Sequence, residues 1–313
     1  MNKILIINFT RMGDLLQSTP MIAGLRSKYP GAEISILVQE AMRPICTGFP
    51  GLDRILSFDA ERYISQLSDP VRGIDSNYVY LQRFIKRIGS DYDLIINLSH
   101  TSLSAKIAGL IGAHEIRGTT MLANGRTVVK HPWMEYFYYV TSQRKYNTFN
   151  LVDMYNRTGE VNPAEKKPLY HVPPEMSSIH EEMLAGTTGE YLGFQLCAST
   201  DSRRWPAEYF GKLAEAVSKN YGWNIVVFGT ESERKFLDEM QEHYSGPVID
   251  CIGRTTMPQL GALLKRCKFL VTNDTGTMHF AAAVGTPVIA IFLAEARSSD
   301  TGPYTENAVI LEA

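Results

Sequence analysis

The clearest structural signal in this 313-residue chain is the stretch at residues 272–292, TNDTGTMHFAAAVGTPVIAIF. An apolar run at 269–271 predicts a buried strand, and the small polar residues after it predict a turn. A helix of small residues is expected to start at about Met278 and to end at Gly285-Thr286-Pro287, before a second apolar strand at 288–292. A helix N-terminus carries free backbone N–H groups and the positive end of the helix dipole. This strand–turn–helix–strand unit therefore favours a phosphorylated ligand.

Strands and helices alternate along the rest of the chain. Strands are predicted at 4–7, 33–38, 55–58, 93–98, 191–196, 224–228 and 247–249. Helices are predicted from the end of the 8–14 loop to residue 28, and at 78–88, 102–111, 207–220, 232–244 and 257–265. This alternation indicates an α/β protein with two Rossmann-like, doubly wound parallel sheets. The proline- and lysine-rich segment 161–175 is the best linker candidate, so we expect domains at 1–170 and 171–313 that face each other across a cleft.

Composition narrows the class of protein. The net charge of −2 argues against nucleic acid as a partner. The four cysteines form no CxxC pair, which fits reduced thiols in a cytoplasm and gives no metal cluster: Cys46, Cys197, Cys251 and Cys267. The first residues do not resemble a signal peptide, and the apolar stretch 279–296 is broken by Gly285-Thr286-Pro287. The sequence predicts a soluble chain that could still touch a membrane surface.

The first candidate site follows the first predicted strand, where the sequence reads Arg11-Met12-Gly13-Asp14. One interpretation makes Asp14 the N-cap of the next helix, because Asp is among the best capping residues. The other makes Asp14 a general base that removes a proton from an attacking hydroxyl. Gly13 is the only glycine here, so the glycine fingerprint of a dinucleotide site is missing and an oxidoreductase is disfavoured.

The second candidate site follows the strand at 191–196. Ser199 and Thr200 offer hydroxyl groups, and Arg203 and Arg204 offer forked donors that suit phosphate. The alternative is an ordinary strand-to-helix loop with solvated arginines. The phosphate interpretation gains because the 272–279 turn is predicted in the same half of the chain.

The third candidate site is the turn quoted above. Asp274 could cap it, and Thr275, Gly276 and Thr277 present N–H and O–H donors. A histidine on a helix, such as His279, more often has a structural role than a catalytic one.

Two further features leave alternatives open. Glu231 and Glu233 follow the strand at 224–228, where a carboxylate can hold ribose hydroxyls or complement a helix dipole, and the sequence does not choose between them. A dense aromatic cluster either packs the domain or, less simply, faces lipid or sugar: Trp133, Tyr136, Phe137, Tyr138 and Tyr139.

Three segments, in this order, resemble the signatures of glycosyltransferase family 9, the ADP-heptose:lipopolysaccharide heptosyltransferases. They are Arg-x-Gly-Asp-x-Leu at 11–16 followed by Thr19-Pro20, the Arg203-Arg204-Trp205-Pro206 segment, and Asp-Thr-Gly-x-x-His at 274–279 before three alanines. The segment from Cys251 to Asn273 also resembles the family. The resemblance covers nearly the whole chain.

The resemblance implies a GT-B fold and an inverting, metal-independent transfer of heptose from ADP-heptose to the inner core of lipopolysaccharide, with no cofactor. Asp14 matches the family's proposed general base, with Arg11, Met12 and Gly13 in an acceptor-side loop. Ser199, Thr200 and Arg203 match the positions that hold the donor diphosphate, and the other donor-binding turn is matched by Asp274, Thr275, Gly276 and Thr277. Arg204, Glu231 and His279 are also expected to bind the donor. Arg203 stands where family members often have lysine. Residues 1–170 would bind the acceptor and 171–313 the nucleotide sugar.

Other expectations accompany the resemblance. Similar proteins continue by a further strand and a helix that crosses back, so the C-terminus is expected to be truncated. The partners would be the nucleotide-sugar donor and a lipid-linked glycan acceptor, at a cytoplasmic location that could include the inner face of the inner membrane. The competing functions are a GT-B transferase that uses another nucleotide sugar and a non-catalytic sugar-nucleotide-binding protein.

Overall fold

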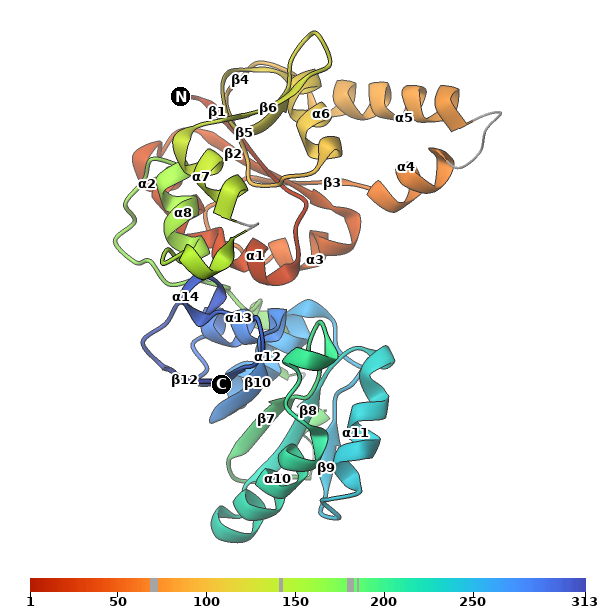
Figure 1. The fold of residues 1–313 in the computed structure, drawn as a ribbon, viewed down its shortest axis with the longest axis vertical. Helices are drawn as coiled ribbons and strands as arrows, with labels where there is room; N and C mark the ends of the chain where they lie inside the picture. The colour runs from red at the N-terminus through yellow and green to blue at the C-terminus, as the bar shows by residue number, and fades with distance from the viewer. Residues whose placement is uncertain (68–72, 141–142, 179–182, 185) are drawn as a thin grey trace. The chain divides into compact units, whose positions relative to one another are not determined.

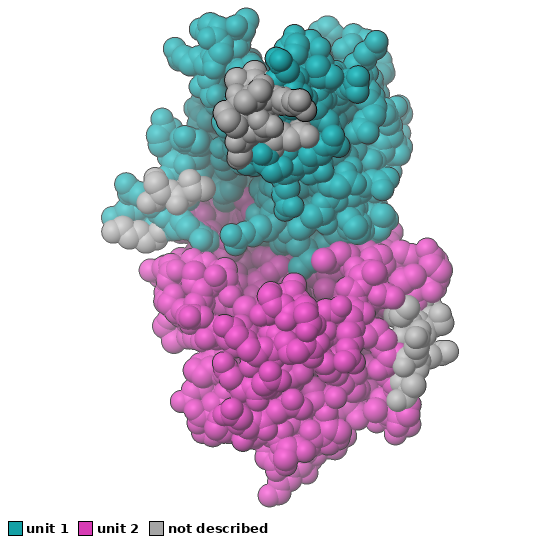
Figure 2. Space-filling model, turned by 90° about the vertical axis from the view of Figure 1, so that its right-hand side faces the viewer, with its two compact units in different colours: residues 1–146, 152–166 teal, residues 147–151, 167–313 magenta. Residues whose placement is uncertain are grey.

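The computed structural model describes residues 1–67, 73–140, 143–178, 183–184 and 186–313. The chain forms two compact units, drawn in different colours in Figure 2. Unit 1 comprises Met1–Tyr146 and Val152–Lys166, and unit 2 comprises Asn147–Leu151 and Lys167–Ala313. The boundary expected between residues 170 and 171 falls just beyond Lys166. Each unit is an α/β structure of its own, as the alternation of strands and helices predicted.

Unit 1 contains a six-stranded sheet in the order β3-β2-β1-β4-β5-β6. Its strands are β1 (Lys3–Asn8), β2 (Glu33–Gln39), β3 (Arg54–Phe58), β4 (Tyr92–Asn97), β5 (Ala113–Met121) and β6 (Thr127–Lys130). The first five are parallel, and β6 pairs antiparallel with β5 at the edge. Every residue of β1 after Lys3 is buried, as expected of a central strand that is covered on both faces.

Helices cover both faces of this sheet (Figure 1). They are α1 (Met12–Gln17), α2 (Thr19–Lys28), α3 (Arg43–Cys46), α4 (Ala60–Leu67), α5 (Gly73–Ile88), α6 (Ser102–Ile111), α7 (Pro132–Val140) and α8 (Leu151–Thr158). The core on one face joins Phe84 and Ile88 of α5 to Ile107 of α6 and to Leu5 and Ile7 of β1. Helices on both faces make the unit doubly wound.

The single helix predicted from the first loop to residue 28 is wrong, because the structure has two helices that meet at Ser18. Pro20 has no N–H group and cannot continue the ladder to the carbonyl of Leu16. The Thr19 hydroxyl donates to that carbonyl instead at 2.7 Å, and the Ser18 hydroxyl donates to the Leu15 carbonyl at 2.6 Å. The break therefore follows from one proline and two neighbouring hydroxyl groups.

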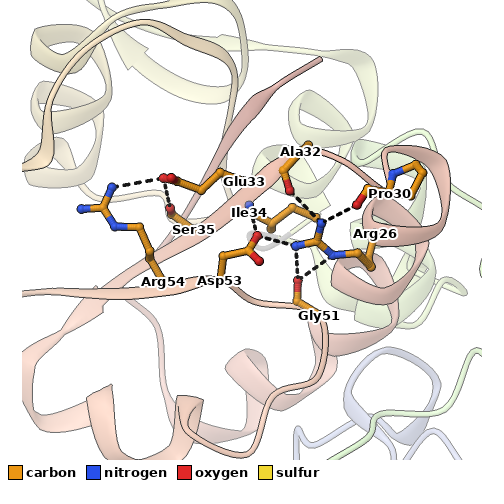
Figure 3. A network of polar contacts seen from close by, with 9 residues as sticks. All are labelled: Arg26, Pro30, Ala32, Glu33, Ile34, Ser35, Gly51, Asp53 and Arg54. Carbon is orange, nitrogen blue, oxygen red and sulfur yellow. Dashed lines mark hydrogen bonds and ion pairs between the residues drawn. The ribbon is translucent and has the colours of Figure 1, made fainter.

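Arg26 ties the end of α2 to the sheet (Figure 3). Its guanidinium donates to the carbonyls of Pro30 at 3.2 Å, Ala32 at 2.7 Å and Gly51 at 3.1 and 3.3 Å. It also pairs with Asp53, whose carboxylate accepts the backbone N–H of Ile34 at 2.7 Å. The Arg26 side chain thus holds the segment before β2 and the segment before β3 in place.

Unit 2 contains a fully parallel sheet in the order β12-β11-β10-β7-β8-β9. Its strands are β7 (Tyr191–Gln195), β8 (Asn224–Phe228), β9 (Val248–Asp250), β10 (Phe269–Asn273), β11 (Val288–Phe292) and β12 (Ala308–Glu312). Its helices are α10 (Ala207–Tyr221), α11 (Arg234–Gln241), α12 (Met257–Arg266), α13 (Gly276–Val284) and α14 (Ser298–Thr301). Phe194 of β7 packs edge-on against Phe210 of α10 at 5.3 Å in its core.

Both sheets have the same strand order, which is 3-2-1-4-5-6 when counted within each unit. In such a sheet the connections wind outward in opposite directions from the two central strands, and ligands bind beyond the carboxyl ends of those strands. The switch point lies between β1 and β4 in unit 1, and between β7 and β10 in unit 2. These two edges are therefore where a site is expected. No helix in the described part of the chain is long and apolar enough to span a membrane.

Candidate functional site

Asp14 lies in the first turn of α1, directly after β1 and thus at the switch point of unit 1. Arg11 occupies the N-cap position that was the alternative interpretation for Asp14. The Arg11 backbone and the Thr10 side chain lie close to the Asp14 carboxylate and favour its charged form. The Thr10 hydroxyl itself donates to the Asn8 side chain.

Burial raises the pKa of the Asp14 carboxyl above its usual value of 3.8. The polar groups of the Arg11 backbone and the Thr10 side chain and the positive charges of Arg11 and Arg144 lower the pKa, but burial outweighs them. The side chain still reaches the surface in part, since its exposure is intermediate. A partly exposed carboxylate with a raised pKa is a stronger base than an ordinary aspartate, which suits proton abstraction.

The loop that carries Asp14 is held by the neighbouring strands. The backbone N–H of Phe9 donates to the Ser99 hydroxyl at 2.7 Å, and the Gln39 amide donates to the Phe9 carbonyl at 2.7 Å. Of the other residues assigned to this loop, Arg11 is exposed, Met12 is half-buried and Gly13 is buried. The loop is thus anchored at its base and open at Arg11.

In unit 2, Asn273 joins the ends of the two central strands. Its amide donates to the carbonyls of Leu196 at 2.9 Å and Cys197 at 3.2 Å, and its carbonyl accepts the backbone N–H of Trp205 at 2.8 Å. The side chain is fully buried. Asn273 therefore fixes the 196–206 loop against the turn at 274–277. Sequence reasoning did not assign it a role, although its place at the end of a buried strand was a usable signal.

Arg203 forms a further contact between the 196–206 loop and the turn at 274–277. Its guanidinium lies 3.7 Å from the Asp274 carboxylate and donates to Glu295 at 3.1 Å, in the segment that follows β11. Arg203 and Asp274 are 18% and 12% exposed, whereas Glu295 is 60% exposed. The two predicted residues are thus brought together, and Glu295 is an additional partner that sequence reasoning did not select.

Arg204 takes a different direction from Arg203. Its guanidinium lies 4.1 Å from the centre of the Phe236 ring and pairs with Asp201. These contacts anchor the short 3-10 turn at Asp201–Arg203 to α11. Ser199 and Thr200, in the same loop, are exposed, and the Thr200 hydroxyl lies 3.1 Å from that of Ser202.

The helix after the turn begins at Gly276, two residues before the predicted start at Met278. Thr275 is the N-cap residue, and among the described side chains none caps the first turn of α13. The Thr277 hydroxyl donates to Gln195 at 3.1 Å. The backbone N–H groups at the start of an uncapped helix have no acceptor within the helix, so this turn can bind an anion.

His279 lies in the first turns of α13 and is 5% exposed. Burial lowers the pKa of its imidazole to about 4, so the ring is neutral at physiological pH. Its Nδ1 atom has no hydrogen-bond partner within the described residues.

The structure separates the roles of Glu231 and Glu233. The Glu233 carboxylate accepts the backbone N–H of Thr230 at 2.7 Å in a capping box. Glu231 is exposed, and both its oxygens accept from the Arg234 guanidinium, at 2.6 and 2.8 Å. These hydrogen bonds lower the pKa of Glu231. Glu231 is therefore the carboxylate left at the surface, oriented by an arginine.

The aromatic cluster lies on α7 and is only partly used in packing. Trp133 contacts Tyr136 and lies under the Arg157 guanidinium at 4.5 Å, while Tyr138 and Tyr139 are 49% and 74% exposed. The packing interpretation holds for the inner rings and not for these two tyrosines.

Cysteine chemistry is disfavoured at these edges. The cysteines are free, and burial raises the pKa of the Cys46, Cys197 and Cys251 thiols to about 12. Their thiolates are therefore scarce at neutral pH. Among the described residues, no group of three or more His, Cys, Asp or Glu side chains could hold a metal ion.

The family model of glycosyltransferase family 9 (heptosyltransferase) matches residues 81–313. Lipooligosaccharide heptosyltransferase 2 of Haemophilus ducreyi is 23% identical, over 99% of this chain and 88% of its own length. Lipopolysaccharide heptosyltransferase 1 of Pseudomonas aeruginosa is 22% identical, over 99% of this chain and 83% of its own length.

Solved structures share the fold. A glycosyltransferase family 9 structure from Veillonella parvula superposes with a TM-score of 0.82 at 22% identity, covering 99% of this chain and 87% of that one. The Escherichia coli heptosyltransferase WaaC with ADP gives 0.74 at 18% identity, covering 99% and 93%.

Two doubly wound units of this kind form the GT-B fold that these solved structures share, and the match to the family model makes the chain a glycosyltransferase enzyme. More particularly, the chain belongs to glycosyltransferase family 9, the heptosyltransferase family.

Proposed function

We propose that this enzyme transfers heptose from ADP-heptose to the inner core of lipopolysaccharide, with inversion at the anomeric carbon and without a metal ion. The observation that carries the proposal is that Arg203 contacts Asp274, in the turn that leads into the uncapped start of α13 at the switch point of unit 2. A cation and free N–H groups at one sheet edge suit a diphosphate. The names of the relatives, which are heptosyltransferases of lipopolysaccharide and lipooligosaccharide, support the choice of sugar and acceptor.

Unit 2 would bind the donor. Arg203 and the N–H groups of Gly276 and Thr277 would hold the diphosphate, with hydroxyls from Ser199, Thr200 and Thr275. Glu231 would accept hydrogen bonds from the ribose, since Glu233 already caps its own helix. Arg204 would act by holding the loop against Phe236. Asp274 would orient Arg203, and the unpartnered Nδ1 of His279 would meet the donor from the helix.

Asp14 would be the general base. Its carboxylate takes the proton from the acceptor hydroxyl as the hydroxyl oxygen forms a bond to the anomeric carbon. The bond from that carbon to the diphosphate oxygen breaks in the same displacement, and ADP leaves with the electron pair. Arg203 and the helix N–H groups stabilise the charge that develops on the leaving group. A single displacement inverts the configuration.

Unit 1 would bind the acceptor, since Asp14 lies there. Arg11, Met12 and Gly13 form the loop beside the base, and Arg11 is exposed. We further propose that the acceptor is lipid-linked and that the enzyme works in the cytoplasm, with peripheral contact at the inner face of the inner membrane. The exposed Tyr139 is of the type that lies at membrane–water interfaces.

The direct test is turnover with ADP-heptose and lipopolysaccharide that lacks its heptoses, in buffer with EDTA. The proposal predicts ADP release, a product one heptose heavier, and an NMR coupling that reports an inverted anomeric centre. Transfer only from another nucleotide sugar, or tight donor binding without transfer to any glycan, would contradict it.

A further inference from the structure

His100 lies in the segment after β4, at the switch point of unit 1, and Asp14 lies in the helix that follows the neighbouring strand β1. The position of His100 is fixed by its neighbours. Ser99 donates its backbone N–H to Asn97 at 3.0 Å and accepts the N–H of Phe9 at 2.7 Å. Asn97 in turn donates to the Thr119 carbonyl at 2.7 Å. The loop with His100 and the loop with Asp14 are therefore joined at their base.

The imidazole of His100 has unmet hydrogen-bonding capacity. Both ring nitrogens are buried, and neither has a hydrogen-bond partner in the described part of the chain. Buried polar atoms in native proteins nearly always have a partner, so a pair without one needs an explanation. Burial also lowers the pKa of the imidazole, so the ring is neutral at physiological pH. A neutral imidazole offers one N–H donor and one acceptor nitrogen.

Aromatic rings of α7 surround the imidazole. Phe137 meets it edge-on at 4.5 Å between ring centres, and Tyr138 lies at 5.7 Å. Phe137 also contacts Tyr155 of α8 at 6.3 Å. Tyr155 is 1% exposed, and its hydroxyl is likewise without a partner among the described residues. Tyr138 is 49% exposed and His100 itself is half-buried, so the imidazole lies near the surface of unit 1 and not in its core.

We propose that His100 is an acceptor-binding residue that hydrogen-bonds two hydroxyl groups of the acceptor sugar, with Tyr138 and Phe137 against the apolar face of the sugar ring. The inference deepens the proposed function and rests on it. A neutral donor–acceptor pair matches hydroxyl groups, which both donate and accept. A phosphate or carboxylate only accepts, and would leave one ring nitrogen unsatisfied. The ligand of this subsite is therefore the uncharged polyol part of the acceptor.

The test uses the full chain and lipopolysaccharide that lacks its heptoses and has been O-deacylated. Four proteins are compared: the unaltered enzyme, His100→Ala, His100→Gln, and His114→Ala as a matched control, because His114 is an exposed histidine of the same unit. For each we measure the acceptor KM, kcat, the Kd of ADP and the thermal midpoint. NMR of histidine ring nitrogens is recorded with and without the glycan.

We expect His100→Ala to raise the acceptor KM about tenfold or more, as the loss of two hydrogen bonds implies, and to leave the Kd of ADP within about twofold. His100→Gln, which keeps a donor and an acceptor, should recover most of the loss, and His114→Ala should behave like the unaltered enzyme. The ring-nitrogen signals of His100 should shift on addition of the glycan.

An unchanged acceptor KM in a folded His100→Ala protein, with glycan-insensitive ring signals, would overturn the assignment while leaving the proposed function intact. If no heptose transfer occurs with any acceptor, the proposed function fails, and the NMR titration alone decides whether His100 binds a glycan. A KM and a Kd of ADP that both rise with a lowered thermal midpoint would show a structural role and also overturn it.

Discussion

Arg203 Nε donates to Glu295 Oε1 at 3.1 Å, although the two residues are 92 positions apart in the chain. The same guanidinium lies 3.7 Å from Asp274. The cation that we assign to the diphosphate is thus shared by two carboxylates. A diphosphate must compete with Glu295, which is the more exposed of the two partners.

Replacement of Glu295 by Gln should therefore tighten ADP binding. The exposed pair is worth little, so the expected gain is about two- to fivefold in Kd. Glu306→Gln, at an exposed position of the same unit, is the matched control and should leave the Kd unchanged. Calorimetry at low salt measures both. Weaker ADP binding in Glu295→Gln would mean that Glu295 helps to hold the donor.

Arg203→Ala should weaken ADP binding about ten- to hundredfold, because a charge-assisted contact to the diphosphate is lost. Arg203→Lys keeps the positive charge but loses the forked guanidinium donors, so its Kd for ADP should lie between those of the unaltered enzyme and Arg203→Ala. The acceptor KM should change by no more than about twofold in either variant. A larger effect on the acceptor than on ADP would reject the division of donor and acceptor between unit 2 and unit 1.

Asp14→Asn should lower kcat by about 10²-fold or more, the loss expected for a general base. Because Asn has nearly the same shape as Asp, the Kd of ADP should stay the same. This Kd serves as the internal control for folding. A rate that persists at a tenth of the original or more would show that Asp14 is not the base.

The raised pKa of Asp14 also sets the direction of two pH effects. The base must be deprotonated, so kcat/KM should fall as the pH is lowered through a pKa above the ordinary 3.8, and this acidic limb should vanish in Asp14→Asn. A folded-state pKa above the unfolded value means that the charged carboxylate costs stability at neutral pH. The thermal midpoint of Asp14→Asn at pH 7 should therefore equal or exceed that of the unaltered enzyme.

Arg26 should matter for stability and not for chemistry. Arg26→Ala removes the donors of three carbonyls and the partner of Asp53 (Figure 3), and we expect a loss of about 1–3 kcal/mol in the free energy of unfolding. Arg54→Ala is the control, since Arg54 pairs only with the exposed Glu33 in that network and should cost less than about 1 kcal/mol. Equal thermal midpoints of the two variants would contradict this account.

The boundaries of strands and helices could be predicted from the sequence where an apolar run ends at a typical turn residue. The strands at 224–228 and 288–292 and the helix at 102–111 were predicted with the boundaries that the structure has. The hairpin of β5 and β6 was missed, because β5 is short of apolar residues at its start. A signal was present in Asn124-Gly125, a dipeptide typical of hairpin turns, and Gly125 has a φ of +80° there.

The residues of the candidate site that lie in the loops after predicted strands could be identified from the sequence. Asp14, Arg203 and the 274–277 turn all come directly after a predicted strand, and Arg203 and Asp274 do meet. Their partners were not predictable in the same way. Glu295 reaches Arg203 from the segment after β11, and the direction of Arg204 depends on Phe236, an aromatic ring on α11. Such contacts depend on side-chain packing that no periodicity records.

The most direct test of the central claim is a calorimetric titration of the enzyme with ADP, UDP and GDP, each with and without EDTA. We predict that ADP binds most tightly, that EDTA does not change its Kd, and that the titration weakens in Arg203→Ala. Selective binding of UDP or GDP, or binding of ADP that EDTA abolishes, would contradict the assignment of an ADP-sugar donor held by arginine and helix N–H groups.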